Sequence, residues 1–144
     1  MSDTTTVYIS ETGASPFAVR IDTGSHIIIG DEAIADGGDN LGASPYQMLA
    51  AALGECTAMT VRWYARQQQW ALEHVAVRIT HEKAELEGRP HKTDIFRKTV
   101  DIRGPALTQE QVAKLVEIAA KCPVQRTLEG QPLITTATGP AFMD

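Results

Sequence analysis

The hydrophobic pattern predicts two hairpins, one before and one after a long helix in the sequence. Near the N-terminus, Phe17 to Ile21 alternates with period two, and His26 to Gly30 is apolar after a turn rich in Asp, Thr, Gly and Ser. These segments predict a hairpin, which residues 1–10 precede as a tail or an edge strand. Farther along, Leu72 to His81 and Ile95 to Ile102 also alternate, and they predict a second hairpin with a long charged loop.

A long apolar helix is predicted between the hairpins. Ser44 is a good N-cap and Pro45 suits the first helical position, and helical periodicity continues to about Gln69. The opposite side of this helix is small and apolar as well, so we expect the helix to be buried on both sides, by a sheet or by a second subunit. One stripe follows i, i+3, i+4 spacing and contains Leu49, Ala52, Leu53, Cys56, Met59, Thr60 and Trp63.

The C-terminal part predicts two further helices and a last strand. Thr108 and Gln111 have the spacing of a capping box, and the helix that they start should end at or before Cys122. Pro123 favours the first position of a short helix, which places Cys122 near its N-cap. Residues 132–138 predict a final strand. The order of these elements predicts an α+β fold with an antiparallel sheet and helices segregated from it.

Composition and charge narrow the possible functions. The 144 residues fit one domain, 1–144, and 43% hydrophobic with 22% charged residues is ordinary for a soluble globular protein. The net charge of -5 argues against nucleic acid as the main partner. No secretory signal and no apolar run of the ~20 residues that span a bilayer is visible, so we expect a cytoplasmic protein that does not use a membrane.

Two cysteines in a reducing compartment indicate inert buried thiols, metal ligands or redox chemistry. Cys56 lies in the middle of the apolar helix, where the simplest interpretation is a small buried hydrophobe, although Gly54 and Glu55 are unusual neighbours there. Cys122 lies where helix N–H groups and the helix dipole would stabilise a thiolate. The histidines form no short ligand spacing with the cysteines, so no metal site is predicted.

Two sequence motifs resemble those of the OsmC/Ohr superfamily. The stretch from Ser44 to Thr60, SPYQMLAAALGECTAMT, is similar to the central-helix motif of the superfamily. The stretch from Cys122 to Leu128, CPVQRTL, is similar to the second motif of its general OsmC-like branch. The resemblance extends from about residue 15 to the C-terminus. It implies antiparallel sheets wrapped around a long buried central helix, in an intertwined homodimer with active sites at the dimer interface.

The resemblance also implies an activity. Cys56 would attack an organic hydroperoxide, and hydrogen peroxide less well, and become a sulfenic acid. Cys122 would resolve the sulfenic acid as a Cys56–Cys122 disulfide, which an external dithiol reductant would reopen. No cofactor is expected. Such a cysteine-based peroxidase would be an antioxidant enzyme of the oxidative stress response.

The sequence departs from the superfamily at the residues that activate the first thiol. Tyr46 stands where the Ohr and classical OsmC branches have a Glu after the proline, and Gln47 where a second acidic residue is sometimes found. Because the thiolate is the nucleophile, Cys56 needs a positive partner. Among the arginines we favour Arg126, which follows Cys122 in the second motif. The further candidates for stabilising the thiolate or lining the pocket are Arg20, Tyr46, Gln47 and Glu55, which adjoins Cys56 in the sequence.

Arg62 lies six positions along the helix from Cys56, too far to reach the thiol of its own chain, but it could reach a partner's site across an interface.

Other functions remain open on the sequence. A non-catalytic dimer that binds a small ligand or senses thiol-reactive compounds through Cys56 is the first alternative. A dimeric scaffold with two packed, inert cysteines is the second.

Overall fold

The computed structural model describes residues 4–140, and the chain divides into two compact units. One unit contains the chain up to residue 48 together with the segment from residue 134, and the other contains residues 49–133. The long helix α1 (Pro45–Gln68) begins in the first unit and continues in the second. The first three residues of the predicted N-terminal tail lie outside the described residues.

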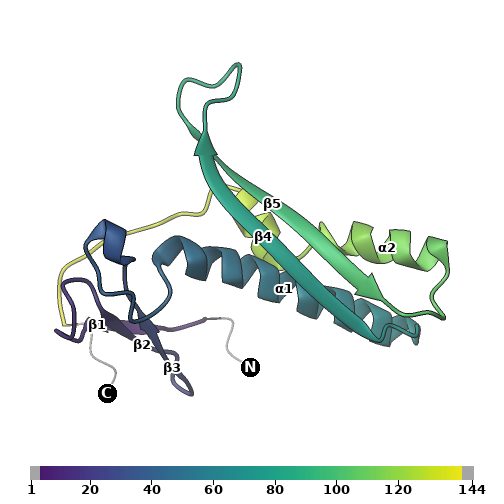
Figure 1. Ribbon diagram of the computed structural model, residues 1–144, viewed down its shortest axis with the longest axis horizontal. Helices are drawn as coiled ribbons and strands as arrows, with labels where there is room; N and C mark the ends of the chain where they lie inside the picture. The colour runs from purple at the N-terminus through teal and green to yellow at the C-terminus, as the bar shows by residue number, and fades with distance from the viewer. Residues whose placement is uncertain (1–3, 141–144) are drawn as a thin grey trace. The chain divides into compact units, whose positions relative to one another are not determined.

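The first unit contains an antiparallel three-stranded sheet in the order β1-β2-β3 (Figure 1). Its strands are β1 (Tyr8–Glu11), β2 (Val19–Asp22) and β3 (Ile27–Gly30). The predicted first hairpin is therefore present, with Val19 opposite Gly30. Gly24 has a φ of +96° in its turn, a conformation that favours glycine.

A buried carboxylate organises the loop that leads from β3 to α1. Asp31 is only 3% exposed. Burial raises the pKa of its carboxyl group, but the hydrogen bonds that the carboxylate accepts outweigh this and hold the pKa below its usual range. The loop includes the short 3-10 helix η1 (Ile34–Asp36). The donors to Asp31 are the Ser15 hydroxyl at 2.9 Å and the backbone N–H groups of Glu32 at 2.8 Å and of Asp39 and Leu41 at 3.2 Å.

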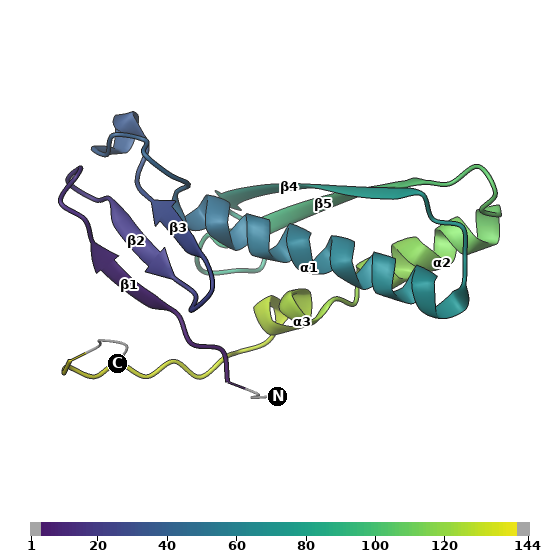
Figure 2. The ribbon, with the colours of Figure 1, turned by 90° about the horizontal axis from the view of Figure 1, so that it is seen from below.

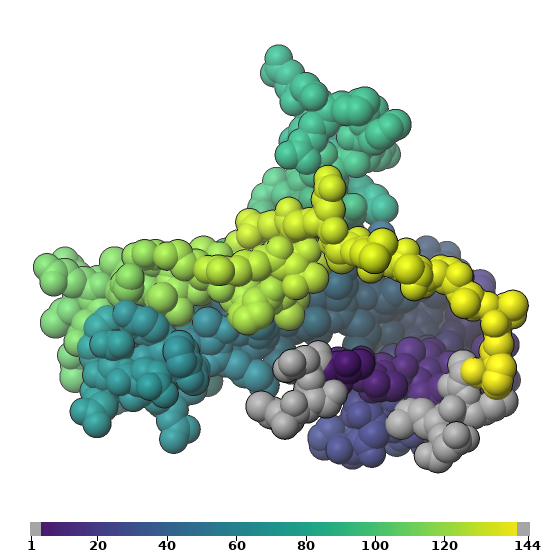
Figure 3. Space-filling view, turned by 180° about the vertical axis from the view of Figure 1, so that it is seen from behind, coloured from purple at the N-terminus to yellow at the C-terminus, as the bar shows by residue number. Residues whose placement is uncertain are grey.

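The second unit contains a long hairpin and most of the helical structure. Strands β4 (His74–Ala84) and β5 (Thr93–Arg103) pair antiparallel, so the second predicted hairpin is present. Figures 1 and 2 show this hairpin running beside α1, and Figure 3 shows the β4–β5 loop projecting from the unit. Two helices follow, α2 (Gln109–Ala119) and α3 (Pro123–Glu129). The capping box predicted at the start of α2 is present in full.

The core of the second unit lies between α1, α2 and the hairpin. Helix α1 contributes a single line of buried residues at i, i+4 spacing, made up of Leu53, Thr57, Val61 and Ala65. Its other side is exposed within the chain: Met59 is 63% and Trp63 is 60% exposed. Burial on both sides, which the sequence predicts, is therefore not provided by this chain alone. The buried core cluster is Val61, Ala65, Leu72, Leu115 and Ala119.

Gly54 lets α1 approach the hairpin closely. A Cβ atom placed on Gly54 would meet the Cγ1 atom of Ile79 on β4 at 3.3 Å, tighter than an ordinary contact. The unusual glycine in the middle of the helix therefore has a packing explanation. The glycine allows the helix backbone near Cys56 to lie close to β4.

The predicted C-terminal strand is wrong. Within the described part of the chain, residues 132–138 adopt no strand conformation, and Leu133 and Ile134 are 90% and 81% exposed. The apolar and β-branched residues give this segment a high strand propensity. A strand nevertheless needs a neighbouring strand to take its backbone hydrogen bonds, and propensity alone does not supply one.

Replacing the most buried leucine tests the core. Leu115 is completely buried, so Leu115→Ala is expected to lower the free energy of unfolding by about 2–5 kcal/mol, because it removes apolar contacts and leaves a cavity. Chemical denaturation measures the loss. Val116 is the next residue on α2 and is 47% exposed, so Val116→Ala serves as the control and should cost much less. Equal losses for the two variants would contradict this description of the core.

Candidate active site

The structure brings the two cysteines together in the second unit. Cys56 lies on α1 and is half-buried, whereas Cys122 is fully buried at the start of α3. Both are free thiols, and Thr57, which follows Cys56 on α1, lies with its hydroxyl 3.5 Å from the Cys122 sulfur, so the two cysteines are close in the fold. Two cysteines that are close in a fold are candidates for a disulfide.

Cys122 is the N-cap of α3, as predicted. Its backbone is extended, with φ -67° and ψ 149°, and its Sγ atom accepts the backbone N–H of Gln125 at 3.4 Å. Pro123 occupies the first turn, where it has no N–H to leave unpaired. On the other side, the Oγ1 atom of Thr57 on α1 lies 3.5 Å from Cys122 Sγ. The same hydroxyl donates to the carbonyl oxygen of Leu53 at 2.7 Å.

A lysine from the hairpin completes the surroundings of the cysteine pair. Lys98 lies on β5 and is half-buried. Its Nζ atom donates to the carbonyl oxygen of Ala119 at 2.8 Å and to Oε1 of Gln125 at 2.6 Å. Gln125 thus connects Lys98 to Cys122, because its side chain accepts from the lysine and its backbone donates to the sulfur.

The electrostatics of the site favour a negative sulfur at Cys122. Burial raises the pKa of the Cys122 thiol, but hydrogen bonds from Thr57, from the Gln125 backbone and from Cys56, together with the charge on Lys98, outweigh it and bring the pKa below its ordinary value. Burial lowers the pKa of Lys98, and the negative charge of the sulfurs of Cys122 and Cys56 opposes that shift in part.

The residues that the sequence proposes around the thiols occupy several places. Arg126 is exposed on α3 and Glu55 is exposed on α1. Arg20 lies on β2 of the first unit, where it forms an ion pair with Asp22 at 3.5 Å. The cation whose charge acts on the Cys122 thiol is Lys98.

Tyr46 and Gln47 belong to the first turn of α1. The Oε1 atom of Gln47 accepts the backbone N–H of Ser44 at 2.9 Å, and the Gln47 N–H donates to the Ser44 hydroxyl at 3.4 Å. This is a capping box, so Gln47 stabilises the start of the helix. Tyr46 is 46% exposed. Both residues line a cavity of about 320 Å³ in the first unit, together with Glu32, Ala33, Asp36, Asn40, Ser44 and Pro45.

Arg62 has a structural role in this chain. Its Nη1 atom donates to the carbonyl oxygen of Leu72 at 2.6 Å, and its Nη2 atom donates to that of Glu73 at 3.3 Å. The arginine thereby connects α1 to the segment that enters β4. Two of the guanidinium donors are therefore used within the chain.

Sequence reasoning missed three residues of the site, which are Lys98, Thr57 and Gln125. A signal for Lys98 is present in the strand pattern, because this lysine falls on the inward face of β5 with Phe96, Val100 and Ile102. A charged residue on the apolar face of a strand is unusual unless something buried needs it. Thr57 and Gln125 carry no comparable signal, since each is an ordinary residue for its helix.

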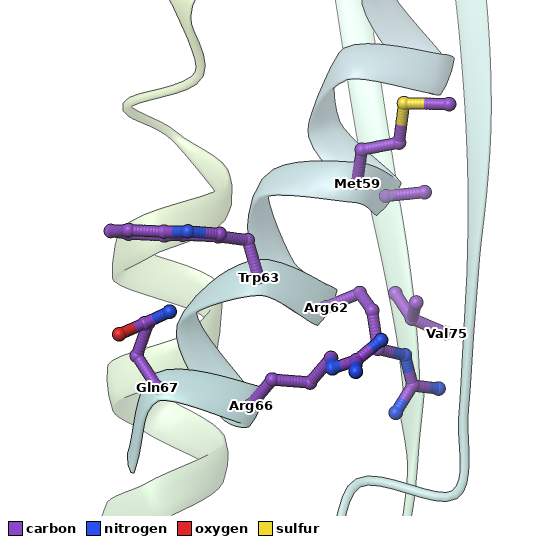
Figure 4. Close-up of a pocket in the computed structure, with 7 residues that line it drawn as sticks. Met59, Arg62, Trp63, Arg66, Gln67 and Val75 are labelled. Atoms are coloured by element: carbon purple, nitrogen blue, oxygen red, sulfur yellow. The ribbon is translucent and has the colours of Figure 1, made fainter.

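The exposed side of α1 carries an open groove of about 620 Å³ (Figure 4). Met59 and Trp63 are its most exposed apolar members, and Arg62 and Arg66 add positive charge from the same helix. Val75 of β4 closes one side in the close-up. The remaining lining residues are Ala58 and Gln67.

The described residues contain neither a metal-ligand cluster nor a helix suited to span a membrane. Within residues 4–140, no three His, Cys, Asp or Glu side chains are grouped so that they could hold a metal ion. In the same residues, none of the helices combines the length and the apolar character that crossing a bilayer requires.

Solved structures with a similar fold come from several bacteria. An OsmC-like protein from Mycoplasma pneumoniae matches with a TM-score of 0.73 at 15% identity, covering 90% of each chain. An organic hydroperoxide resistance protein, OsmC, from Legionella pneumophila matches at 0.66 and 21% identity, covering 90% of this chain and 92% of the other. An organic hydroperoxide resistance protein from Elizabethkingia anophelis matches at 0.66 and 20%, covering 90% and 92%.

The sequence comparisons agree with the fold. Among curated proteins, none matches the chain significantly. The family model for OsmC-like proteins matches residues 37–137, which include both cysteines, the whole of α1 and the hairpin. The α+β fold with antiparallel sheets and the superfamily resemblance predicted from the sequence are therefore confirmed, and the chain belongs to the OsmC-like protein family.

Proposed function

We propose that this protein is a thiol-dependent peroxidase that reduces organic hydroperoxides, and hydrogen peroxide less well. The observation that carries the proposal is the position of the half-buried Cys56 near the buried Cys122, in a site that Lys98 joins through its hydrogen bond to Gln125. A half-exposed thiol next to a second thiol has the arrangement that two-step peroxide reduction requires. The organic hydroperoxide resistance proteins among the structural relatives support the same choice of substrate.

The reaction follows from the positions of the two sulfurs. The Cys56 sulfur attacks the outer oxygen of the hydroperoxide, so that an S–O bond forms, the O–O bond breaks and an alcohol leaves with a proton. The Cys122 sulfur then attacks the sulfenic sulfur, so that an S–S bond forms and water leaves. In total, two thiols and one hydroperoxide give a disulfide, an alcohol and water.

The cycle closes with an external dithiol and uses no cofactor. A dithiol reductant reopens the Cys56–Cys122 disulfide by exchange, which restores both thiols. Such a cycle suits a compartment that keeps thiols reduced, and we therefore place the protein in the cytoplasm, in the defence against oxidative stress.

The active form in this proposal is a homodimer. The exposed groove on α1, with Met59 and Trp63 at its surface, supports it because large apolar side chains gathered on one surface mark an interaction site. A second copy packed on this side would cover the part of α1 that the chain itself leaves exposed. That would give the central helix the burial on both sides that its sequence predicts.

Stopped-flow oxidation of the reduced protein tests the activity. We expect faster oxidation by cumene hydroperoxide than by hydrogen peroxide, and an intact mass two hydrogens lower after one equivalent. Loss of both titratable thiols should accompany the change in mass. The thiols of the folded protein could instead stay reduced under excess cumene hydroperoxide while the unfolded protein oxidises. That result would contradict the peroxidase function and favour the ligand-binding or scaffold function.

A further inference from the structure

We propose that Lys98 is the positioning residue for the second step of the reaction, in which Cys122 closes the disulfide on Cys56. It acts by fixing Gln125, and with it the start of α3, where Cys122 lies. The proposal rests on the peroxidase function and concerns the resolving step only. In that step the Cys122 sulfur attacks the sulfenic sulfur, an S–S bond forms, the S–O bond breaks, and the leaving oxygen takes the Cys122 proton and departs as water.

Helix α3 has little apolar packing to hold it in place. It contains seven residues, none of them buried, and a helix this short is not stable by itself. Its N-cap residue, Cys122, is by contrast fully buried. Beyond the helix, Leu133 and Ile134 are exposed, so these apolar side chains do not anchor α3 from its C-terminal side. The position of Cys122 therefore depends largely on specific contacts at the start of the helix.

Lys98 joins the end of α2 to the start of α3. Its Nζ atom donates to the carbonyl oxygen of Ala119, the last residue of α2, at 2.8 Å and to Oε1 of Gln125 at 2.6 Å. The last carbonyl groups of a helix have no partner inside the helix and lie at the negative end of its dipole, so an ammonium group stabilises them. One lysine of β5 thus ties both helices to the hairpin, at the junction that contains Cys122.

Gln125 transmits this fixed position to the sulfur of Cys122. Its side-chain oxygen accepts from Lys98, and its side-chain nitrogen donates to Oε2 of Glu129 at 3.4 Å, so the amide is held at both ends. Its backbone N–H donates to Cys122 Sγ at 3.4 Å. Without the contact to Lys98, the first turn of α3 loses this link to the hairpin, and the direction in which the sulfur points is less well fixed.

The hairpin also lies against the turn of α1 that contains Cys56. Lys98 is opposite Ile79 in the register of β4 and β5. Ile79 in turn packs on Gly54, where a Cβ atom would come within 3.3 Å of its Cγ1 atom. Thr57, the residue after Cys56, has its hydroxyl 3.5 Å from the sulfur of the other cysteine. The same pair of strands therefore places both cysteines, one through helix packing and the other through Lys98.

The cost of a lysine at this position supports a specific role. Lys98 lies half-buried on the inward face of β5, with Phe96 and Val100 as its neighbours on that face. Burial lowers the pKa of Lys98, because the charged ammonium group loses hydration there. An apolar side chain of similar length would fill the same space without that cost. The ammonium group has both of its hydrogen-bond acceptors at the α2–α3 junction.

Closure of a mixed disulfide tests the position of Cys122 without peroxide. One equivalent of dipyridyl disulfide attaches to the more accessible Cys56 and releases a first thiopyridone, and Cys122 then displaces the mixed disulfide and releases a second. In Lys98→Met we expect the first release to keep the wild-type rate and the second to be about tenfold slower or more, because misplaced reacting atoms slow an intramolecular attack. Lys98→Arg keeps donors for the same acceptors and should recover most of the rate.

Gln125→Ala breaks the same link from the other end. It keeps the charge of Lys98 and the backbone N–H that donates to Cys122, and it should slow the second release to a similar extent. The double variant should be no slower than either single variant, since both changes remove one interaction. Arg97→Met is the control, because Arg97 precedes Lys98 on β5 but is exposed and pairs with Glu82, so both releases should keep their rates.

The two releases separate the possible outcomes. A second release as fast in folded Lys98→Met as in the wild type, or an equal slowing of both releases, overturns the positioning role. A wild type without a second release, or losses that multiply in the double variant, also overturns it. If Lys98→Met does not fold, Gln125→Ala decides by the same criteria. If the releases behave as expected while the wild-type thiols stay reduced under excess cumene hydroperoxide, the peroxidase function fails and the positioning of Cys122 stands.

Discussion

Cys56→Ser is expected to abolish hydroperoxide reduction, with a loss on the order of 10³-fold or more, because it removes the sulfur that the substrate reaches. Cys122→Ser should instead accumulate sulfenic and then sulfinic acid on Cys56, since nothing remains to trap the first oxidation state. The wild type should stop at an intramolecular disulfide. Peroxide titration followed by dimedone labelling and peptide mass spectrometry distinguishes the three products.

The two serine variants form a matched pair, although Cys122 is fully buried and Cys56 is half-buried. Each removes one sulfur and leaves a hydroxyl of similar size, so that a difference in product reflects position and not folding. Dimedone on Cys122 in the Cys56→Ser protein would show that Cys122 reacts first and would reverse the two roles. Disulfide-linked dimers in the wild type, in place of the internal disulfide, would remove the resolving role from Cys122.

Trp63→Glu is expected to convert the proposed homodimer into a monomer. Trp63 is 60% exposed within the chain and lies in the groove on α1, so that a partner copy would bury it. A carboxylate buried without a partner is costly, and a symmetric interface would contain it twice, so the dissociation constant should rise on the order of 10²-fold or more. Light scattering across a dilution series measures the change.

Ala113→Glu is the control for this variant. Ala113 is exposed on α2, away from the groove, so the same added charge should leave the oligomeric state unchanged. Far-ultraviolet circular dichroism checks that Trp63→Glu remains folded. A wild-type protein that is a folded monomer at micromolar concentration would contradict the dimer directly, and an unchanged dimer in Trp63→Glu would show that the copies meet on another surface.

Local sequence signals were sufficient for most of the elements. Alternation with period two placed both hairpins, and the residues at helix starts placed α1 and α2, where Ser44 with Gln47 and Thr108 with Gln111 form capping boxes. These signals succeed because their physics is local, since a capping side chain reaches a backbone group only three residues away. The strand predicted at 132–138 failed because a strand depends on a neighbour that its own sequence does not contain.

The sequence also singled out the two cysteines that lie close together in the fold. The Cys56 and Cys122 motifs marked the thiol pair, and the Cys122–Pro123 junction correctly predicted an N-cap cysteine. The resemblance carried by those motifs gave the family, which the match over residues 37–137 confirms. A motif identifies residues by their type and order in the sequence, and this was sufficient to single out both cysteines.

The tertiary structure decided how the site is charged and which side of α1 the chain buries. Lys98 comes from a strand more than forty residues from Cys56 in the sequence, and only the packing of the hairpin on α1, at Gly54, brings it to the thiols. The sequence made the first half of α1 apolar on nearly all sides. The fold selected the line from Leu53 to Ala65 for the core and left Met59 and Trp63 outside. Charge and burial depend on three-dimensional neighbours, which spacing along the chain does not specify.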